Sequence, residues 1–469
     1  MTFNSLPFLI FLPLSVLLYY SLAPRYRWIL LLGLSYFFYM WWNPAYIVLI
    51  VVSTLIDFFA ARAIEQQKSR KNQRKLLMLS LVTNLGLLFS FKYYGFFTKS
   101  AEGIFKIAGF DFQFPYMDVL LPVGISFYTF QTLSYTLDVF YGRQKADQHL
   151  GYFALYVCYF PQLVAGPIER YDRLAPQLRK DIKPEYDNFS RGLRLILFGL
   201  FVKMVIADNM APIVDEVYKN PEILGSWHIL TGLVFYSFQI YADFYGYSTI
   251  AVGTALLMGV SLMDNFKTPY LSRNISEFWQ RWHISLSTWF RDYLYIPLGG
   301  NQVKYSFWIL NILIVFTISG LWHGANYTFV IWGSLFGVIY IFERFFSEQW
   351  GWRTPEAWGI QRIPGVIKTF VLVTLAWVFF RSPDIGTAGK IFSGIYSNWG
   401  IADPWFPATE ILVWLGLFIA LDILLFNDRF DYWAGRKPAW ARWTIYAVLL
   451  FGITAFGGTD NQPFIYFQF

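Results

Sequence analysis

Charged side chains are scarce in this sequence, and their scarcity indicates the class of protein. Only 14% of the 469 residues are Asp, Glu, Lys or Arg, whereas 56% are hydrophobic and 22% are aromatic. Soluble domains carry about 25% charged residues, so we predict an all-α polytopic membrane protein in contact with the lipid bilayer. The Lys and Arg residues gather in short loops beside apolar runs, which is typical of membrane topology and not of a nucleic-acid module.

Cysteine and the common cofactor motifs are almost absent as well. The single Cys158 lies in an apolar stretch, so the sequence excludes an intrachain disulfide and a cysteine-rich metal site. We find no Walker loop, no Rossmann glycine spacing, no HExxH motif and no tandem repeat. We therefore predict no metal site and no permanently bound cofactor. The first residues lack a basic n-region and a cleavage site, so we expect the first span to stay in the membrane.

Histidine occurs four times, and two of the four lie between residues 273 and 323. From residue 274 onward, apolar residues at spacings of three and four predict one helix that carries His283 on its apolar face and ends near Pro297. A functional role and a hydrogen bond to a core carbonyl are both open for such a histidine.

His323 has a stronger claim to function. The sequence contains no Asp, Glu, Lys or Arg from residue 305 to residue 341, and an ionisable group inside such a run is a functional hypothesis. Trp322 and Asn326 lie beside it and are supporting candidates. A histidine that is only hydrogen-bonded between helices is the alternative.

Several segments form a joint pattern with these histidines. They are FWQRWHISLSTW (278–289), GLWHGAN (320–326), LPVGISFYTFQTLSYTLDVFYG (121–142), YFPQLVAGPIERY (159–171), YADFYGYSTIAVG (241–253) and the final FIYFQF. The pattern resembles the membrane-bound O-acyltransferase (MBOAT) family, in its bacterial branch of alginate O-acetylases and D-alanyl-lipoteichoic acid transferases. Within that branch the polysaccharide O-acetylation membrane proteins look most similar.

The resemblance implies a fold, an activity and roles for the two histidines. The fold would have about 11–12 transmembrane helices, with re-entrant and amphipathic helices, around a central funnel or tunnel. His323 would be the catalytic residue. His283 would occupy a second signature position where other branches have Asn or Asp, which favours positioning or polarising the substrate over obligatory proton transfer.

The implied reaction moves an acetyl group from a cytosolic donor, acetyl-coenzyme A, to an exported polysaccharide acceptor such as alginate. Transfer would be direct or through an extracytoplasmic O-acetyltransferase partner protein. D-alanyl transfer and peptidoglycan O-acyl transfer by the same fold are alternatives. So is a transporter in which His283, His323, Asp138 and Asp243 relay protons.

Acyl transfer needs a base, a donor for the developing oxyanion and exclusion of water. A histidine in an apolar tunnel meets the first and third needs. We predict that cations at the inner face bind the phosphates of the donor, although plain membrane topology also explains them; they are Lys267, Arg273, Arg281 and Arg291. Asp138 and Asp243 could orient a histidine or a hydroxyl, or clamp two helices together.

The loops predict an orientation and an order of parts. The basic loop 61–75 is expected in the bacterial cytoplasm after three spans, which places the N-terminus outside the cytoplasmic (inner) membrane. The basic loop 169–194 is also expected in the cytoplasm, so the run 150–165 should dip into the membrane and return. We predict one membrane domain over residues 1–469, with N-terminal helices (1–117), a catalytic core (118–342) and C-terminal helices (343–469).

Overall fold

The computed structural model describes residues 1–115, 121–164, 166–351, 359–401, 406–457 and 464–465. The chain divides into two compact units. Unit 1 comprises Met1–Thr2, Leu6–Glu185 and Met258–Leu262, and unit 2 comprises Phe3–Ser5, Tyr186–Leu257 and Met263–Phe469. The boundary at residues 185–186 falls inside the segment 118–342 that we predicted as the core.

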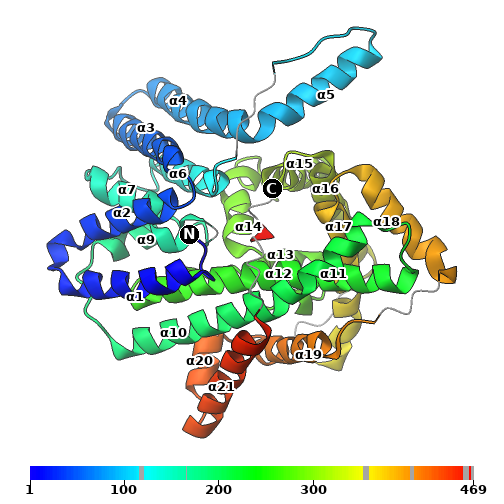
Figure 1. Ribbon diagram of the computed structural model, residues 1–469. Helices are drawn as coiled ribbons and strands as arrows, with labels where there is room; N and C mark the ends of the chain where they lie inside the picture. Colours follow the sequence, from blue (N-terminus) through cyan, green and yellow to red (C-terminus); the bar gives the residue numbers. More distant parts are fainter. Residues whose placement is uncertain (116–120, 165, 352–358, 402–405, 458–463, 466–469) are drawn as a thin grey trace. The chain divides into compact units, whose positions relative to one another are not determined.

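Every regular element in the described residues is a helix (Figure 1). Unit 1 contains α1 (Leu6–Ser21), α2 (Pro24–Met40), α3 (Ile47–Gln66), α4 (Arg70–Leu88), α5 (Tyr94–Ile107), α6 (Ile125–Phe140), α7 (Leu150–Cys158), α8 (Phe160–Leu163) and α9 (Tyr171–Leu178). Unit 2 contains α10 (Tyr186–Phe201), α11 (Asp208–Lys219), α12 (Ser226–Leu257), α13 (Ile275–Arg281), α14 (Ile284–Phe290), α15 (Tyr305–His323), α16 (Tyr327–Trp350), α17 (Ile363–Arg381), α18 (Ile385–Ser397), α19 (Thr409–Leu424), α20 (Phe430–Gly435) and α21 (Ala439–Phe456).

Short 3-10 and π segments join several of these helices. The 3-10 segments are η1 (Pro44–Tyr46), η4 (Pro269–Leu271), η6 (Ile360–Arg362) and η7 (Asn398–Gly400). The π segments are η2 (Phe89–Tyr93), η3 (Val202–Ala207) and η5 (Arg291–Tyr295). Because η2 and η3 continue the helices on both sides, α4 with α5 and α10 with α11 form two long helical stretches.

Seven helical stretches in the described part of the chain are long and apolar enough to cross a bilayer. They are Pro44–Gln66, Arg70–Ile107, Tyr186–Lys219, Tyr305–His323, Tyr327–Gln349, Ile360–Arg381 and Ala439–Phe456. The protein is thus an all-α, multi-pass membrane protein. The expected 11–12 crossings also count runs that form shorter helices, such as α1, α2 and α19, and that number stays a prediction.

The predicted apolar runs correspond to helices with different bounds in two places. The sequence also predicts an apolar run over residues 118–141. In its described part, from residue 121, α6 begins only at Ile125, after Gly124 in a left-handed conformation (φ 78°). The run 150–165 is divided into α7 and α8, of 9 and 4 residues. A bilayer crossing takes about 20 helical residues, so neither helix could cross by itself, as the re-entrant prediction requires.

Unit 1 has a polar centre among α3, α4 and α6. The buried carboxylate of Asp57 accepts hydrogen bonds from Ser80 (2.5 Å), Thr136 (3.1 Å) and the amide of Asn84 (2.9 Å). A buried polar group is costly unless it is hydrogen-bonded. The three helices are therefore tied together by one carboxylate and its neutral donors.

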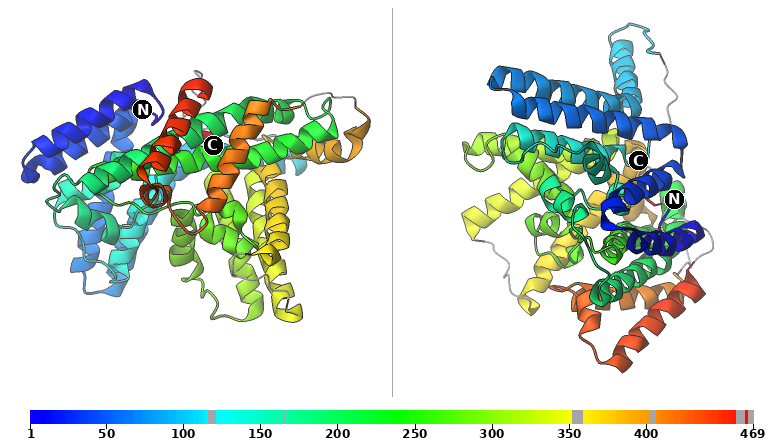
Figure 2. Two further views of the ribbon diagram at one scale, coloured as in Figure 1. Left: turned by 90° about the horizontal axis from the view of Figure 1, so that it is seen from below. Right: turned by 90° about the vertical axis from the view of Figure 1, so that its left-hand side faces the viewer.

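Unit 2 is built on the antiparallel pair α10 and α12. The two long green helices run side by side in Figure 1 and in the left view of Figure 2. Helices α15 and α16 form a second close pair. The two backbones approach so closely at Gly320 that a Cβ atom there would lie 2.2 Å from the carbonyl oxygen of Phe329. Small residues permit such close approach of membrane helices, and this contact holds the end of α15 in place.

Candidate functional site

His283 and His323 meet in unit 2. His323 is the last residue of α15, and His283 is the N-cap of α14. Their ring centroids are 6.3 Å apart, and the side chains are buried, at 0% and 4% exposure. The indole of Trp322 lies 5.0 Å from His323 and 6.1 Å from His283. Two histidines that are 40 residues apart in the sequence thus form one buried site.

Aromatic rings surround both imidazoles. Trp332 of α16 and Phe380 of α17 pack edge-on against His323, with centroid distances of 5.1 and 5.4 Å. Phe244 of α12 packs edge-on against His283 at 4.7 Å. Such an enclosure excludes bulk water, which would otherwise compete as an acyl acceptor.

The single helix predicted from residue 274 is wrong at its centre, because the chain breaks at His283. Helix α13 ends at Arg281, His283 adopts a left-handed conformation (φ 43°, ψ 54°), and α14 begins at Ile284. The backbone nitrogens of Leu286 and Ser287 donate to the His283 carbonyl at 3.0 Å, so His283 starts the second helix. The break directs the imidazole toward His323, which a continuous amphipathic helix would not require.

Burial also controls the charge of His283, which lies outside the seven candidate spans. Removal from water lowers the pKa of the His283 imidazole well below its usual range. The ring is therefore neutral at physiological pH. A neutral imidazole can accept a hydrogen bond or a proton, which suits a polarising or positioning role.

The left-handed backbone conformation of His283 predicts the relative thermal stability of two variants at this position. At an ordinary site glycine is less stable than alanine by up to about 1 kcal/mol, whereas a left-handed conformation costs an L-residue about 1–2 kcal/mol. We expect His283→Gly to unfold at an apparent temperature equal to or above that of His283→Ala, since both variants remove the same imidazole. Thermal unfolding of the purified variants in one detergent measures the order. A clearly less stable glycine variant would contradict the left-handed assignment.

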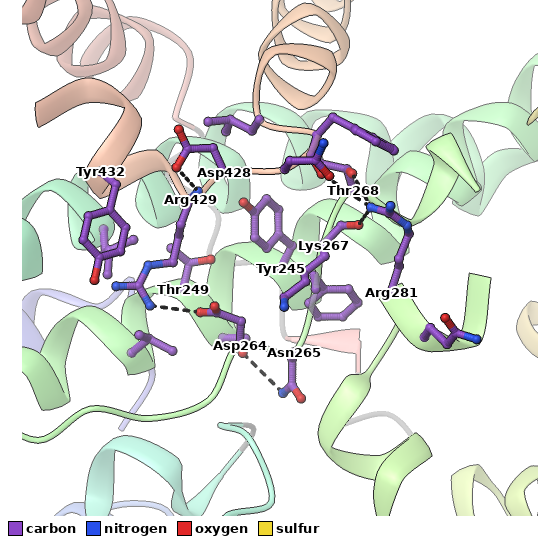
Figure 3. Close-up of a pocket in the computed structure, with 18 residues that line it drawn as sticks. Tyr245, Thr249, Asp264, Asn265, Lys267, Thr268, Arg281, Asp428, Arg429 and Tyr432 are labelled. Carbon is purple, nitrogen blue, oxygen red and sulfur yellow. Dashed lines mark hydrogen bonds and ion pairs between the residues drawn. The ribbon is translucent and has the colours of Figure 1, made fainter. Parts of the chain in front are cut away.

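A cavity of about 510 Å³ lies beside this site within unit 2 (Figure 3). Its walls come from α12, from the segment 264–268, from the end of α13 and from the segment 425–432. Phe266 lines the cavity and contacts Phe244 at 5.0 Å, and Phe244 contacts His283. Two aromatic rings in series, Phe266 and then Phe244, thus lie between the cavity and His283.

The structure brings two of the four predicted donor-binding cations to this cavity, Lys267 and Arg281. Arg273 instead contacts Glu277 (3.4 Å), and Arg291 pairs with its neighbour Asp292 (2.8 Å).

The two cavity cations differ in their availability. The guanidinium of Arg281 pairs with Glu277 at 2.9 Å and donates to the Lys267 carbonyl at 3.0 Å. Arg429, a third cation in the wall, pairs with Asp264 at 3.2 Å (Figure 3). Lys267 is exposed and has no ion-pair partner among the described residues. Unlike the two paired arginines, its ammonium group could therefore bind an anion in the cavity without first breaking an ion pair.

The predicted carboxylates have partners of their own. Asp243 is buried in α12 and pairs with Lys203 at 2.6 Å, and its other oxygen accepts a hydrogen bond from the backbone nitrogen of Ile465 at 2.7 Å. Asp138 belongs to unit 1 and pairs with Arg143 at 3.4 Å. Asp243 therefore joins α12 to η3 and to the end of the chain, as a clamp between segments would.

Asn326 and the final motif have structural surroundings too. Asn326 is the N-cap of α16: its side-chain oxygen accepts from the backbone nitrogen of Thr328 (3.2 Å), and its amide donates to the Pro383 carbonyl (2.7 Å). This cap fixes the turn that follows His323. Of the final FIYFQF motif, Phe464 and Ile465 are described, and Phe464 stacks on Tyr247 at 4.5 Å. The other four residues lie outside the described residues.

Sequence reasoning missed several residues of this site. Lys203 is the only charged residue in the apolar run 195–206, and a lone charge in such a run was the available signal. Asn265, which lines the cavity and contacts the segment after His283, carries no such signal, because it lies in a short polar loop. Trp332 and Phe380 could not be distinguished from the many other aromatic residues of the sequence.

Comparisons with known proteins agree with this geometry. Residues 35–380 match the model of MBOAT, the membrane-bound O-acyltransferase family. A protein named probable alginate O-acetylase from Pseudomonas putida is 35% identical over the whole of both chains. The peptidoglycan O-acetyltransferase of Helicobacter pylori is 35% identical, over 84% of this chain and 79% of its own. The teichoic acid D-alanyltransferase of Bacillus subtilis is 32% identical, over 55% of this chain and 68% of its own. The buried histidine pair, the helical membrane fold and these matches lead to one conclusion: the chain belongs to the membrane-bound O-acyltransferase family and is an O-acyltransferase.

Proposed function

We propose that this protein transfers an acetyl group from acetyl-coenzyme A to a hydroxyl of an exported polysaccharide, with His323 as the general base. The observation that carries the proposal is the buried pair of His283 and His323 beside a cavity whose wall carries Lys267, a cation without an ion-pair partner in the part of the chain that the structure describes. The names of the relatives support an acetyl group as the cargo, since alginate O-acetylase and peptidoglycan O-acetyltransferase both transfer acetyl.

In the proposed reaction, the acetyl group moves from the thioester sulfur to the acceptor oxygen, and the hydroxyl proton moves to the sulfur by way of His323. The acceptor hydroxyl oxygen attacks the thioester carbonyl carbon while His323 takes the hydroxyl proton. The carbon–sulfur bond then breaks, and the proton passes to the departing thiolate, which leaves as coenzyme A. His283, held neutral by burial, polarises or positions the reacting groups, and the ring cage excludes water.

The cavity suits the donor end of this reaction. Coenzyme A carries several phosphates at one end and the thioester at the other. Phosphates would bind at Lys267, supported by Arg281, and the thioester would extend past Phe266 and Phe244 toward His283. The chain would lie in the bacterial inner membrane with its N-terminus outside, so that the basic loops and this cavity face the cytoplasm.

The acceptor would approach from the opposite face, either as the polymer itself or as a hydroxyl of an extracytoplasmic partner that modifies the polymer. Alginate is the acceptor we favour, because the probable alginate O-acetylase of Pseudomonas putida matches over the full length of both chains. Peptidoglycan is the second acceptor, favoured by the Helicobacter pylori relative.

Inside-out membrane vesicles from cells that make the polymer provide the test, because they expose the cytoplasmic face and retain any partner. Acetyl-coenzyme A with a radiolabelled acetyl group is added, and label in polymer is measured after washing. Labelled polymer supports the proposal, and its digestion products distinguish alginate from peptidoglycan. No label from acetyl-coenzyme A, with label from an activated D-alanyl carrier protein, would replace the proposal by D-alanyl transfer.

Lys267 gives a prediction for the donor site. We expect Lys267→Ala to raise the KM for acetyl-coenzyme A about 10- to 150-fold with little change in kcat, because a charge-assisted hydrogen bond to phosphate contributes about 1.5–3 kcal/mol. Arg291→Ala is the matched control, since Arg291 is a cation that pairs with Asp292; its KM should stay within twofold. Equal effects of the two variants would indicate a general surface-charge effect and contradict a phosphate contact at Lys267.

A further inference from the structure

Asn265 connects the wall of the cavity to the segment that follows His283. It lines the cavity and is 2% exposed. Its backbone carbonyl accepts a hydrogen bond from the Ile284 nitrogen at 3.0 Å. Its side-chain oxygen accepts from the hydroxyl of Ser285 at 2.6 Å and from the Ser285 nitrogen at 3.3 Å. The two residues directly after His283 thus donate three hydrogen bonds to Asn265.

The remaining polar group of Asn265 is also engaged. Its side-chain amide donates to the hydroxyl of Ser248 in α12 at 3.3 Å. On the other side of His283, the Lys267 nitrogen donates to the Arg281 carbonyl at 3.0 Å. The segment 265–267 therefore pairs with the chain both before and after His283, and Asn265 anchors this pairing to the long helix α12.

His283 needs such support because its backbone conformation is unfavourable. A non-glycine residue with φ of 43° persists only when its surroundings hold it there. The hydrogen bonds on Asn265 act on Ile284 and Ser285, the first residues of α14. They determine where α14 begins, and so the direction in which His283 leaves the backbone.

We infer that Asn265 is a positioning residue that holds His283 opposite His323 and makes the cavity wall and the histidine one rigid piece. The inference rests on the proposed function and deepens it. A donor bound in the cavity would therefore lie at a fixed place relative to the histidine pair, because Asn265 belongs to the cavity wall and bonds to the segment after His283. Its effect should appear in the chemical step, since a 1 Å displacement of a reacting group is costly to rate.

Kinetics in the inside-out vesicles separate positioning from donor contact. Asn265→Ala and Ser285→Ala both remove the hydrogen bond from the Ser285 hydroxyl to the Asn265 side-chain oxygen, and Ser285 is not among the residues that line the cavity. Asn265→Ala also removes the bond from the Ser285 backbone nitrogen and the bond to the Ser248 hydroxyl. We expect Asn265→Ala to lower kcat about tenfold and Ser285→Ala to lower it by a smaller factor, each with a KM for acetyl-coenzyme A within twofold. The double variant should be no worse than Asn265→Ala alone. Asn265→Asp keeps the oxygen acceptor and should restore at least a third of kcat.

The control is Thr288→Ala in the same helix. Among the described residues, the Thr288 hydroxyl bonds only to carbonyls of its own turn, that of Ile284 at 2.8 Å and that of Ser285 at 3.0 Å. This variant should leave kcat within twofold. A rise in KM for Asn265→Ala with no effect of Ser285→Ala would overturn the inference and make Asn265 a donor contact. Multiplying effects in the double variant would overturn it as well.

Hydrogen exchange tests the positioning independently of the donor. Exchange of the backbone amides at 284–287 is measured by mass spectrometry on the purified protein in lipid nanodiscs. We expect faster exchange in Asn265→Ala and Ser285→Ala than in Thr288→Ala. Unchanged exchange would refute the positioning role even if acetyl transfer is real. Faster exchange in a protein that transfers no acetyl group would leave the positioning role intact and refute the proposed function.

Discussion

Replacing His323 by alanine is expected to lower acetyl transfer about 100- to 10,000-fold, because a positioned general base contributes that much to rate. The imidazole is buried among Trp332, Phe380 and His283. A water molecule that entered the space left by the ring would be a weak base at neutral pH. The rate of label transfer from acetyl-coenzyme A to polymer in inside-out vesicles, at equal protein abundance, measures the effect.

His149→Ala is the matched control for this experiment. His149 is exposed, and its side chain caps α7 by accepting from the Tyr152 nitrogen at 3.2 Å. The loss of such a cap lowers the free energy of unfolding by about 1 kcal/mol. It does not remove the proposed base, so acetyl transfer by His149→Ala should stay near the wild-type rate. Transfer by His323→Ala at a similar rate would remove the base assignment. The protein would then be better described as a membrane scaffold for a partner enzyme.

The two histidines of the candidate site could be selected from the sequence because they lie in unusual surroundings. His323 follows a long apolar run without a charge, and the resemblance placed His283 in a second signature. Their meeting could not be derived from either segment alone. It depends on the pairing of α15 with α16 and on the packing of Phe244 against His283, which are contacts between segments far apart in the sequence.

The helix break at His283 could not be predicted from periodicity. Apolar residues at helical spacing continue through residues 282–283 because both sides of the break face the same core. The hydrogen bonds from Ile284 and Ser285 to Asn265 stabilise the break, and they come from a segment about 20 residues earlier. Tertiary hydrogen bonds thus override a local helical preference.

The break gives a physical reason for the residue types at this signature position. The resemblance implies His, Asn or Asp there in different branches. These three residues are several-fold enriched, among residues other than glycine, in the left-handed region. A position with φ of 43° therefore favours these three residues for its backbone conformation alone.

The sequence could not show which of the predicted donor-binding cations is free to bind a phosphate, because this too depends on tertiary contacts. Loop position predicts that Arg273, Arg281 and Lys267 lie near one membrane face, but ion pairing decides which charge is available to bind an anion. Glu277 contacts both arginines, at 3.4 Å and 2.9 Å. The sequence could have predicted that Glu277 pairs with Arg273 and Arg281, because each arginine is four residues away from it. The exposure of Lys267 depends on the path of the segment 264–268, which only the structure shows.

Two reciprocal glycine pairs hold α10 against α12, the helix that carries Asp243 and Phe244. A Cβ atom at Gly246 would lie 2.7 Å from the Gly199 carbonyl oxygen, and one at Gly199 would lie 2.7 Å from the Gly246 oxygen. Gly192 and Gly253 repeat this arrangement at 2.8 and 2.7 Å. Both pairs are separated by seven residues on each helix, so the two glycine stripes run antiparallel along one contact line.

Gly246→Ala is therefore expected to destabilise the protein by about 1–3 kcal/mol, the usual cost of overpacking. The added methyl group would meet backbone atoms of Gly199 and Lys203, which cannot rotate away. A fall of several degrees in the apparent melting temperature of the purified protein in detergent measures this. Gly33→Ala is the matched control, because a Cβ atom at Gly33 in α2 meets nothing within 4 Å; alanine should be neutral or slightly stabilising there.

The two glycines of one pair should also act together. Once the methyl group of the Gly246→Ala variant has pushed α12 away from α10, a second methyl group at position 199 meets a carbonyl that has already moved. Gly199→Ala combined with Gly246→Ala should therefore cost less than the sum of the single variants, whereas Gly192→Ala, one pair further along, should couple more weakly. Additive losses, or a Gly246→Ala variant as stable as Gly33→Ala, would contradict the close packing of α10 on α12.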